Sequence, residues 1–402
     1  MPALTPVDEV IETLVSRALA VGDIERVSVS AALGRVLADD VLAAVDVPSF
    51  TNSSMDGYAC RASDVEAGMS YEVSDRVTAG NAGRTLLPGT LVRIFTGAPL
   101  PEGADAVVIQ EDTALKNERV VVNQQPGTGD NVRPRGQDIS SGGAILRNGH
   151  RLRPQDLALA ASTGCYQLSV YRRLRVGVLS TGDELVDPPE PLAPGQIYNS
   201  NHFGLLAMIE QEGFDAHDLG REEDDRNAIR EKLAVAADQV DCVITSGGVS
   251  VGEADHVREA VNDMGAIDIW RLAIKPGKPL AFGNVKGTAF FGLPGNPVST
   301  FVTFRMIALP YLRRCQGQQD VMPRFLWAHA GFSWKTETRR EYLRVQLSND
   351  ESGRLMAEVF GEQGSGVMSS VCWADALAMV DVGQTVEPVS YTHLTLPTIL
   401  LV

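Results

Sequence analysis

Apolar runs alternate with helix-like segments through the middle of the chain, from residue 173 to residue 318. Short β-branched runs bounded by turn residues indicate buried strands, and they occur at 174–179, 214–219, 241–245, 267–274 and 289–293. A helix that Asn201 caps and Gly213 ends is expected between two of them, and a long apolar helix ends at Arg314. This alternation predicts a central, doubly wound and mostly parallel sheet with helices on both faces.

The N-terminal part of the chain has a helical pattern. Thr5 and Pro6 suit the start of a helix, and a one-sided apolar stripe follows. A second short helix is expected at Ser30, so residues 1–45 are interpreted as a helical arm. A helix at 154–164 returns the chain to this arm, and 140–172 are therefore assigned to the same linking domain. The arm serves either as structure or as a dimer contact.

Two further segments read as β structure. Residues 46–139 have no helical period and contain short strands between glycine turns, which predicts a small inserted β domain. Strands expected at 325–332, 342–347, 355–359 and 377–382 predict a C-terminal β domain over 319–389. Residues 390–402 are apolar and uncharged, so they are interpreted as a frayed tail or as sequence foreign to the native gene. The predicted fold class is a multidomain α/β protein whose central α/β domain spans 173–318.

Polar turns rich in glycine and proline follow the predicted strands of the central domain. Ligands of parallel sheets bind beyond the carboxyl ends of the strands. The turn after 241–245 begins Ser246-Gly247-Gly248, and its two glycines allow bare N–H groups to approach an anion. Taken alone, this turn favours a ligand site only slightly over the alternative, a tight connection without a ligand. The other turns at equivalent positions are STGDE at 180–184, the Asp224-Asp225 pair, KPGKP at 275–279 and LPGNP at 293–297.

These turns carry side chains that suit phosphate chemistry. Lys275 and Lys278 lie in a proline-stiffened loop, where they can hold a phosphate or another tetrahedral oxyanion. Carboxylates near a phosphate usually hold Mg²⁺, and the candidates are Asp183, Glu184, Asp224, Asp225 and Asp255. Together they predict metal-assisted cleavage of a phosphoryl bond. His202 and His256 are the plausible acid–base histidines, and without a GxxxxGKS or GxGxxG motif, kinase and dehydrogenase functions are weakly supported.

The predicted inserted domain adds a few polar candidates. Asp56 lies in the turn-rich stretch 46–60, and Thr96 begins a Thr-Gly-Ala-Pro turn after a strand. The loop 131–138 brings two arginines together with Asp138, and loop arginines can bind oxyanions bidentately. Each of these features is equally consistent with a solvated surface.

Composition narrows the class of protein. The chain has 402 residues, 44% of them hydrophobic, and a net charge of −16. This charge argues against a general nucleic-acid or membrane-surface binder, so an anionic ligand needs a local cationic patch. The five cysteines form no CxxC pair, which indicates neither a disulfide framework nor a zinc site. No signal-peptide or transmembrane pattern is present, so a cytoplasmic protein is expected.

The motifs, taken in order, resemble those of one family. They are PSFTNSSMDGYA, RIFTGAPLPEGADAVV, GDNVRPRGQDI, STGDEL, GQIYNSN, TSGGVSVGEADHV, KPGKPLAFG and GLPGNPVS. The chain resembles the molybdopterin molybdenumtransferases, the MoeA and gephyrin E-domain family, from about residue 5 to about residue 388. The resemblance implies a MogA-like central domain and an elongated homodimer. It also implies insertion of molybdenum from molybdate into adenylylated molybdopterin, with Mg²⁺ and with release of AMP.

The resemblance also implies roles for individual residues. The α/β and C-terminal domains of one subunit and the inserted domain of the other are expected to form the cleft. The residues expected to be catalytic are Asp56, Thr96 and Asp138 of the facing subunit and Glu184, Asp225, Asp255, Lys275 and Lys278. The substrate-binding residues are expected to be Thr181, Gly182, Ser246, Gly247, Gly248, Ser250, Pro294, Gly295, Asn296, Pro297, Arg344 and Ser365. Asp183, Glu184, Asp224 and Asp225 are the expected metal ligands.

Two alternatives and one departure accompany the resemblance. The alternatives are adenylylation of molybdopterin, which an α/β domain of this type alone would perform, and a non-enzymatic molybdopterin-binding scaffold. The adenylylating enzyme and molybdoenzyme acceptors are possible partners. The final dozen residues do not look like a family C-terminus, and if they are foreign, the C-terminal domain is expected to lack its closing strand.

Overall fold

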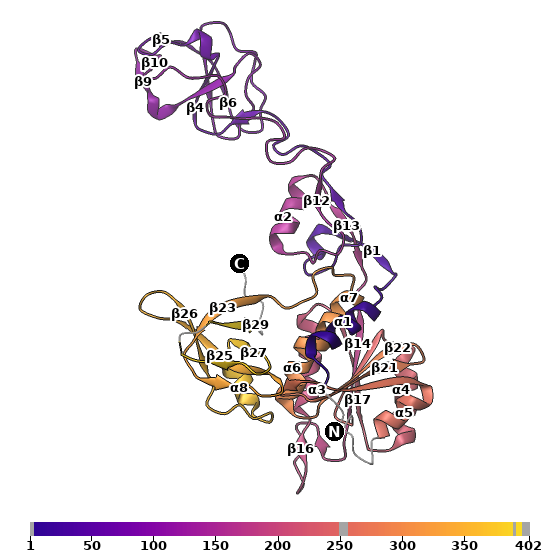
Figure 1. The fold of residues 1–402 in the computed structure, drawn as a ribbon. Helices are drawn as coiled ribbons and strands as arrows, with labels where there is room; N and C mark the ends of the chain where they lie inside the picture. Colours follow the sequence, from indigo (N-terminus) through magenta and orange to yellow (C-terminus); the bar gives the residue numbers. More distant parts are fainter. Residues whose placement is uncertain (1–3, 249–255, 389–390, 396–402) are drawn as a thin grey trace.

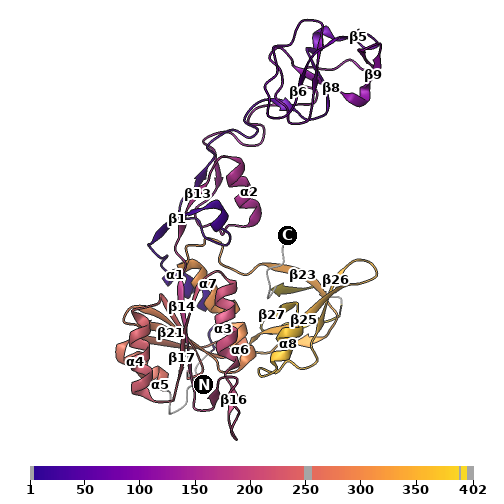
Figure 2. The same ribbon diagram turned by 180° about the vertical axis from the view of Figure 1, so that it is seen from behind.

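The computed structural model describes residues 4–248, 256–388 and 391–395. The described chain forms four regions in an elongated arrangement (Figure 1). A linking region stands between the inserted β domain at one end and the α/β and C-terminal domains at the other. The same arrangement is seen from behind in Figure 2. No helix within the described ranges combines the length and apolarity needed to cross a membrane.

The α/β domain is built on a six-stranded sheet in the order β17-β14-β18-β22-β21-β19. The first four strands are parallel, and β21 runs antiparallel to both of its neighbours. The mostly parallel sheet is therefore confirmed, while β21 is an additional strand that the alternating pattern did not predict. The strands are β14 (Arg175–Thr181), β17 (Asp215–Glu222), β18 (Cys242–Ser246), β19 (Gly265–Arg271), β21 (Pro279–Val285) and β22 (Thr288–Leu293).

Helices cover both faces of this sheet, as expected. One core contains the buried side chains of α4 and α5, and the other contains those of α3, α6 and α7. A π-helical turn, Phe304–Ala308, joins α6 to α7, so the long apolar helix is continuous but irregular. The helices are α3 (Ser200–Gln211), α4 (Arg226–Ala237), α5 (His256–Met264), α6 (Pro297–Thr303) and α7 (Leu309–Cys315), and a small ribbon is formed by β15 (Leu185–Val186) and β16 (Ile197–Tyr198).

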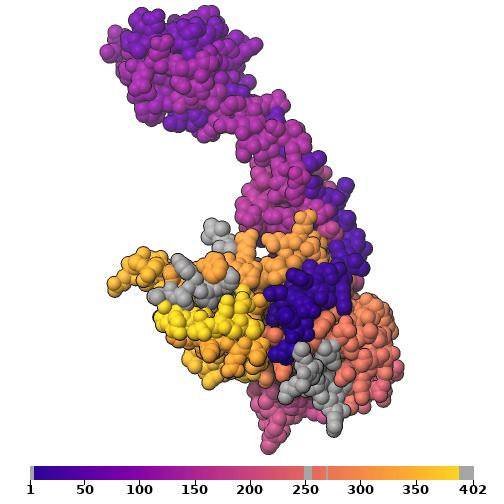
Figure 3. Space-filling view, viewed as in Figure 1, coloured from indigo at the N-terminus to yellow at the C-terminus, as the bar shows by residue number. Residues whose placement is uncertain are grey.

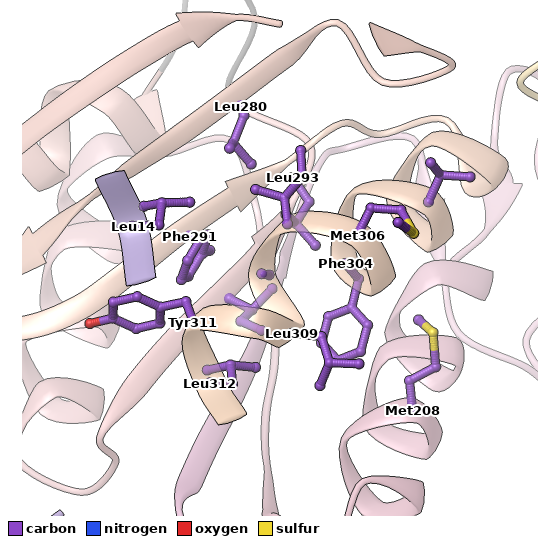
Figure 4. Close-up of a cluster of buried hydrophobic side chains, with 14 of the residues drawn as sticks. Leu14, Met208, Leu280, Phe291, Leu293, Phe304, Met306, Leu309, Tyr311 and Leu312 are labelled. Atoms are coloured by element: carbon purple, nitrogen blue, oxygen red, sulfur yellow. The ribbon is translucent and has the colours of Figure 1, made fainter. Parts of the chain in front are cut away.

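The first helix packs against the α/β domain. The buried face of α1 (Val7–Arg17) joins the same core as α6 and α7. Figure 4 shows Leu14 of α1 near Phe291 and Tyr311, whose ring centroids are 5.3 Å apart. Arg340 of the C-terminal domain also donates to Asp8 at 2.7 Å. The helix thus belongs structurally to the body of the molecule rather than to a separate arm.

The linking region is a mixture of strands and one helix. The expected helix at Ser30 is wrong, because only a 3-10 turn forms at Val29–Ala31 before Gly34 turns the chain at a φ of 73°. Helix α2 (Pro154–Ser162) is present as expected. The strands are β1 (Ile24–Ser28) with β13 (Gln167–Tyr171), and β2 (Val41–Leu42) with β12 (Ala144–Leu146).

Charged contacts attach the linking region to the α/β domain. The side chain of Glu212, at the end of α3, is fully buried. It accepts from Arg151 of the linking region at 3.3 Å and from Arg305 and Arg313 at 2.9 Å each. These three arginines surround one carboxylate, so the position of the linking region is fixed by a buried charge cluster.

The inserted domain contains three small sheets, in the orders β6-β7-β4-β8, β5-β10-β9 and β11-β3. A narrow neck of chain joins it to the linking region (Figure 3). Its predicted β character is confirmed. The strands are β3 (Asn52–Ser53), β4 (Gly57–Cys60), β5 (Ser70–Tyr71), β6 (Val73–Val77), β7 (Leu91–Ile94), β8 (Ala106–Ile109), β9 (Thr113–Lys116), β10 (Arg119–Val122) and β11 (Val132–Arg133).

The C-terminal domain is a closed ring of strands. Strands β25, β26, β23, β29 and β27 pair in that order, and β27 pairs back to β25. A closing strand, whose loss was expected if the last residues were foreign, is present, because residues 391–395 form β29 between β23 and β27. The elements are β23 (Phe325–Ala330), β24 (Trp334–Lys335), β25 (Arg340–Asn349), β26 (Leu355–Val359), α8 (Met368–Trp373), β27 (Ala376–Val380), β28 (Thr385–Val386) and β29 (Tyr391–Thr395).

One strand of the α/β domain joins the C-terminal sheet. Strand β20 (Ile274–Lys275) pairs in parallel with the start of β25, so that Lys275 lies opposite Glu341. The backbone N–H of Arg340 also donates to the carbonyl of Ala273 at 2.8 Å. The two domains are therefore connected by backbone hydrogen bonds beside the lysine-containing turn.

Candidate functional site

A cleft of about 560 Å³ lies where the α/β and C-terminal domains meet. Turns from both domains form its walls, including three of the turns expected from the sequence. The lining residues are Gly247, Gly248, Lys275, Pro276, Gly277, Lys278, Pro279, Pro294, Gly295, Asn296, Ser299, Arg339, Gln363, Gly364 and Ser365. Predicted residues from both domains are thus brought together at one site.

Close backbone packing explains the glycines of this cleft. Gly247 and Gly248 have positive φ values of 95° and 64°, which side chains rarely adopt. The N–H of Gly247 donates to the carbonyl of Leu293 at 3.0 Å. A Cβ on Gly295 would lie 3.7 Å from the Cα of Gly247. The Ser-Gly-Gly turn and the Pro-Gly-Asn-Pro loop consequently form one continuous wall of exposed backbone.

Cationic side chains form another part of the lining. Lys275, Lys278 and Arg339 all reach it. The carbonyl of Lys278 accepts from the N–H of Leu272 at 2.8 Å, which closes the proline-rich loop between them. This cluster supplies the local positive patch that an acidic protein needs in order to bind an anion.

A carboxylate of the C-terminal domain holds the Lys275 side chain in position. Its Nζ lies 3.2 Å from both carboxylate oxygens of Glu341. The Glu341 side chain is only 10% exposed, and its Oε2 also accepts from Trp334 Nε1 at 3.0 Å. The lysine is therefore positioned by an ion pair, whereas no ion pair is found for Lys278 among the described residues.

The arginine in this cleft differs from the one expected. Arg344 is almost fully buried and donates to Ser370 Oγ at 3.0 Å and to the carbonyl of Tyr342 at 3.2 Å. Burial lowers the pKa of Arg344 to about 10. The structure thus places Arg344 in the domain interior, while Arg339 lines the cleft with Ser365. The Arg339-Arg340 pair at the start of β25 was the available signal, but the sequence did not indicate which arginine faces the cleft.

Several expected substrate-binding residues lie behind the lining. Ser246 is 5% exposed, and its Oγ accepts from Asn201 Nδ2 at 2.7 Å. Thr181 is also buried, and its Oγ1 has no hydrogen-bond partner in the described parts of the chain. Pro297 begins α6. The carboxylate of Glu184 folds over Gly182, because a Cβ there would lie 2.5 Å from Glu184 Oε2.

The expected acidic residues cluster beside the Thr181–Glu184 turn. Asp183 Oδ1 accepts from the N–H of Asp224 at 3.0 Å. Burial, together with the negative charges of Asp183 and Glu184, raises the pKa of Asp224. Asp225 instead caps α4 by accepting from the N–H of Ala228 at 2.8 Å. Among the described residues, no three acidic, histidine or cysteine side chains converge on one point as metal ligands.

Other predicted residues have varied surroundings. His202 is buried, with Nδ1 at 3.3 Å from Ser180 Oγ and Nε2 at 3.0 Å from Asp218 Oδ1. It therefore packs beneath the turns instead of facing the cleft. Ser250 and Asp255 lie outside the described residues. His256 begins α5 and lies near Asp224, where a positive charge on its ring would lower the pKa of Asp224.

The expected residues of the inserted domain are distant from the cleft of the same chain (Figure 1). Asp56 Oδ1 accepts from both the N–H and the hydroxyl of Thr96 at 2.8 Å. These hydrogen bonds lower the pKa of Asp56. Asp138 is exposed near the neck, where its N–H donates to the carbonyl of Val47 at 2.9 Å. The pairing of Asp56 with Thr96 was not predicted, because the two residues are far apart in sequence.

Comparisons with known proteins cover nearly the whole chain. The family described as "MoeA N-terminal region (domain I and II)" matches residues 5–164. "Probable molybdopterin binding domain" matches 177–314, and "MoeA C-terminal region (domain IV)" matches 328–388. The three matches occur in the order of the structural regions.

Whole-length relatives agree with these matches. The molybdopterin molybdenumtransferase of Haemophilus influenzae is 38% identical over 381 residues, covering 92% of this chain and 94% of that protein. Its counterpart in Nostoc is 36% identical over 397 residues, covering 96% and 91%. A MoeA structure from Pyrococcus horikoshii OT3 has a TM-score of 0.85 at 27% identity, covering 98% of this chain and all of that chain. Another Pyrococcus MoeA structure has a TM-score of 0.78 at 30% identity, covering 98% of this chain and 99% of that chain. The chain therefore belongs to the MoeA family, the molybdopterin molybdenumtransferases of molybdenum cofactor biosynthesis.

Proposed function

We propose that this protein transfers molybdenum from molybdate to adenylylated molybdopterin and releases AMP. The observation that carries the proposal is the single cleft that combines Lys275, Lys278 and Arg339 with the Ser-Gly-Gly turn. In the reaction, water cleaves the phosphoanhydride bond between the pterin phosphate and AMP, so that AMP leaves. Molybdate exchanges an oxygen, which leaves as water with the two thiol protons, for the dithiolene sulfurs. Such a substrate brings two kinds of anion, phosphate and molybdate, to one site.

The two walls of the cleft suit these two anions. Backbone N–H groups of a glycine turn after a parallel strand bind phosphate, which assigns Gly248 and the Pro294–Pro297 loop to the nucleotide and the pterin phosphate. Gly247, whose own N–H donates to Leu293, would shape this turn. Fixed ammonium and guanidinium groups suit a tetrahedral oxyanion, which assigns Lys275, Lys278 and Arg339 to molybdate. Ser365 adds a residue from the C-terminal domain to the same wall.

Mg²⁺ fits the chemistry of the acidic cluster. Magnesium is usually bound by one or two carboxylates together with substrate phosphates and water, so a complete protein cage is not required. Burial and, after it, the negative charges of Asp183 and Glu184 raise the pKa of Asp224, and a divalent cation would relieve this repulsion. One or two of the carboxylates of Asp183, Glu184 and Asp224 would hold the ion together with substrate phosphate and water, while Asp225 supports the helix. When bound, Mg²⁺ would neutralise phosphate charge during cleavage.

A homodimer would complete the site. Asp56, Thr96 and Asp138 lie far from the cleft in their own chain, on a domain carried by an extended neck (Figure 3). A two-fold partner would bring these residues to the neighbouring cleft, because symmetric pairs exchange equivalent elements. The Asp56–Thr96 pair would then present a fixed carboxylate to the substrate. The proposal also includes a cytoplasmic location, receipt of substrate from the adenylylating enzyme and delivery to molybdoenzymes.

The deciding experiment measures AMP release from adenylylated molybdopterin with Mg²⁺, with and without molybdate. Stimulation of AMP release by molybdate supports the transferase. Formation of adenylylated molybdopterin from ATP would instead identify an adenylyltransferase. Substrate binding without either reaction would identify a scaffold, and both of these results would contradict the proposal.

A further inference from the structure

Asn201 lies in the first turn of α3 and contacts two turns of the cleft wall. Its Nδ2 donates to Ser246 Oγ at 2.7 Å and to the carbonyl of Gly295 at 2.7 Å. Ser246 ends β18, and Gly295 follows the end of the neighbouring parallel strand β22. One amide group therefore joins the two segments at the point where their strand pairing stops.

This contact helps to determine which backbone groups of the Pro-Gly-Asn-Pro loop are available to an anion. Thr300 Oγ1 donates to the carbonyl of Pro294 at 2.5 Å, and the backbone N–H of Thr300 donates to the carbonyl of Asn296 at 2.9 Å. Asn201 occupies the carbonyl between them, that of Gly295. Carbonyl oxygens repel an oxyanion, so a loop whose three successive carbonyls are hydrogen-bonded to protein groups is suited to face phosphate.

The helix that carries Asn201 is itself attached to the other strand ends. Next to it, His202 contacts Ser180 on β14 and Asp218 on β17. Asn199 Nδ2 donates to Asp187 at 2.9 Å. The first turn of α3 is thus attached at or just beyond the carboxyl ends of β14, β18 and β22 and to the middle of β17, which gives Asn201 a rigid support.

We propose that Asn201 is a positioning residue that holds the Ser-Gly-Gly turn and the Pro-Gly-Asn-Pro loop at the separation required by the substrate phosphate. Asn201 is not among the residues lining the cleft, so it acts through Ser246 and Gly295. The sequence interpretation gave Asn201 a helix-capping role, but Asn199 occupies the cap and leaves the Asn201 amide available for this contact. The identity of the ligand in this inference rests on the proposed function, whereas the contact of Asn201 with the two segments does not depend on it.

The test uses the full-length protein and AMP as the binding probe. In Asn201→Ala, loss of two hydrogen bonds is expected to weaken AMP binding about tenfold or more by titration calorimetry. The KM for adenylylated molybdopterin rises in parallel, with little change in kcat. Asn201→Gln, which keeps the amide donor, recovers part of the loss. Asn227→Ala is the matched control, because Asn227 is an exposed residue on α4.

A second measurement does not depend on activity. Amide hydrogen exchange at 246–248 and 293–296 is expected to accelerate in Asn201→Ala but not in the control, with an unchanged melting temperature. Unchanged exchange and unchanged AMP affinity would overturn the proposal, as would a general loss of stability that alone accounts for weaker binding. If the unsubstituted protein bound no AMP, the proposed function would fail, whereas the exchange data would still decide whether Asn201 holds the two segments.

Discussion

Replacing each of the two cleft lysines by alanine distinguishes the role of its charge in oxyanion binding from its role in stabilising the junction between the two domains. Lys275→Ala and Lys278→Ala are both expected to abolish molybdate-dependent AMP release, because each removes an ammonium group from the same oxyanion site. Only Lys275→Ala is expected to lower stability as well. The difference follows from Glu341, whose nearly buried carboxylate is paired with Lys275.

The expected loss of folding stability follows from how far Lys275 and Glu341 are each buried. A buried acceptor that loses its charged partner costs about 1–3 kcal/mol. Lys275 is 44% exposed, so solvent screening places the expected loss at the lower end, about 1–2 kcal/mol. Trp334 Nε1 still donates to the carboxylate and limits the cost. Lys278 is exposed, and its substitution is expected to change stability by no more than about 0.5 kcal/mol.

Urea denaturation followed by tryptophan fluorescence measures this difference, since Trp334 lies beside Glu341. The double variant Lys275→Ala/Glu341→Gln removes the unpaired charge and is expected to regain most of the stability without regaining turnover. Equal stability of the two single variants would refute the reasoning about the ion pair. Normal AMP release by either variant would refute its assignment to the oxyanion site.

Three other predictions concern stability. Glu212→Ala leaves three partly or fully buried arginines without their shared carboxylate and is expected to cost about 3–5 kcal/mol in urea denaturation; a change below about 1 kcal/mol would contradict this role. Deletion of residues 389–402 removes β29, opens the ring of strands and is expected to lower the melting temperature and promote association through exposed edges, as seen by light scattering. Burial raises the pKa of Asp156, but hydrogen bonds from Arg153 and His150 outweigh it and hold that pKa at about 2. Because this value lies below that of an unfolded aspartate, the stabilisation is present above about pH 4 and is lost as the pH falls toward 2, so Asp156→Asn should flatten the acid limb of stability against pH.

The sequence predicted the parts of the fold that depend on local pattern. Period-two and helical runs located β14, β17, β18, β22 and their helices, because burial on one or both faces leaves a direct trace in the sequence. Strand β21 escaped prediction because alternation of strands and helices was assumed throughout. Its Gly283 permits a close approach, since a Cβ there would lie 2.1 Å from the carbonyl of Ala266, and this requirement arises only in the folded sheet.

The sequence predicted which turns form the cleft, but it predicted less well which side chains line the cleft. The glycine and lysine turns reach the cleft because their strands end at the same edge of the sheet. Choosing between Arg339 and Arg344 required knowledge of which side of β25 faces the domain interior. Ser246 and Asn201 are similar cases, because both lie near the site but their hydrogen bonds direct them to each other. Such contacts depend on distant segments and leave no periodic signal.

The shared strand β20 has a consequence for how a substrate enters. Many two-domain enzymes close around their ligand by hinge motion, and part of the binding energy is then used to bring the domains together. Here, the residue next to Pro276 already forms part of the sheet of the C-terminal domain, through its pairing with Glu341. Opening the cleft by a hinge would break backbone hydrogen bonds, so the cleft is preorganised and induced fit between these two domains is disfavoured. Association should therefore follow a single concentration-dependent phase in stopped-flow mixing, without a later isomerisation of this pair of domains.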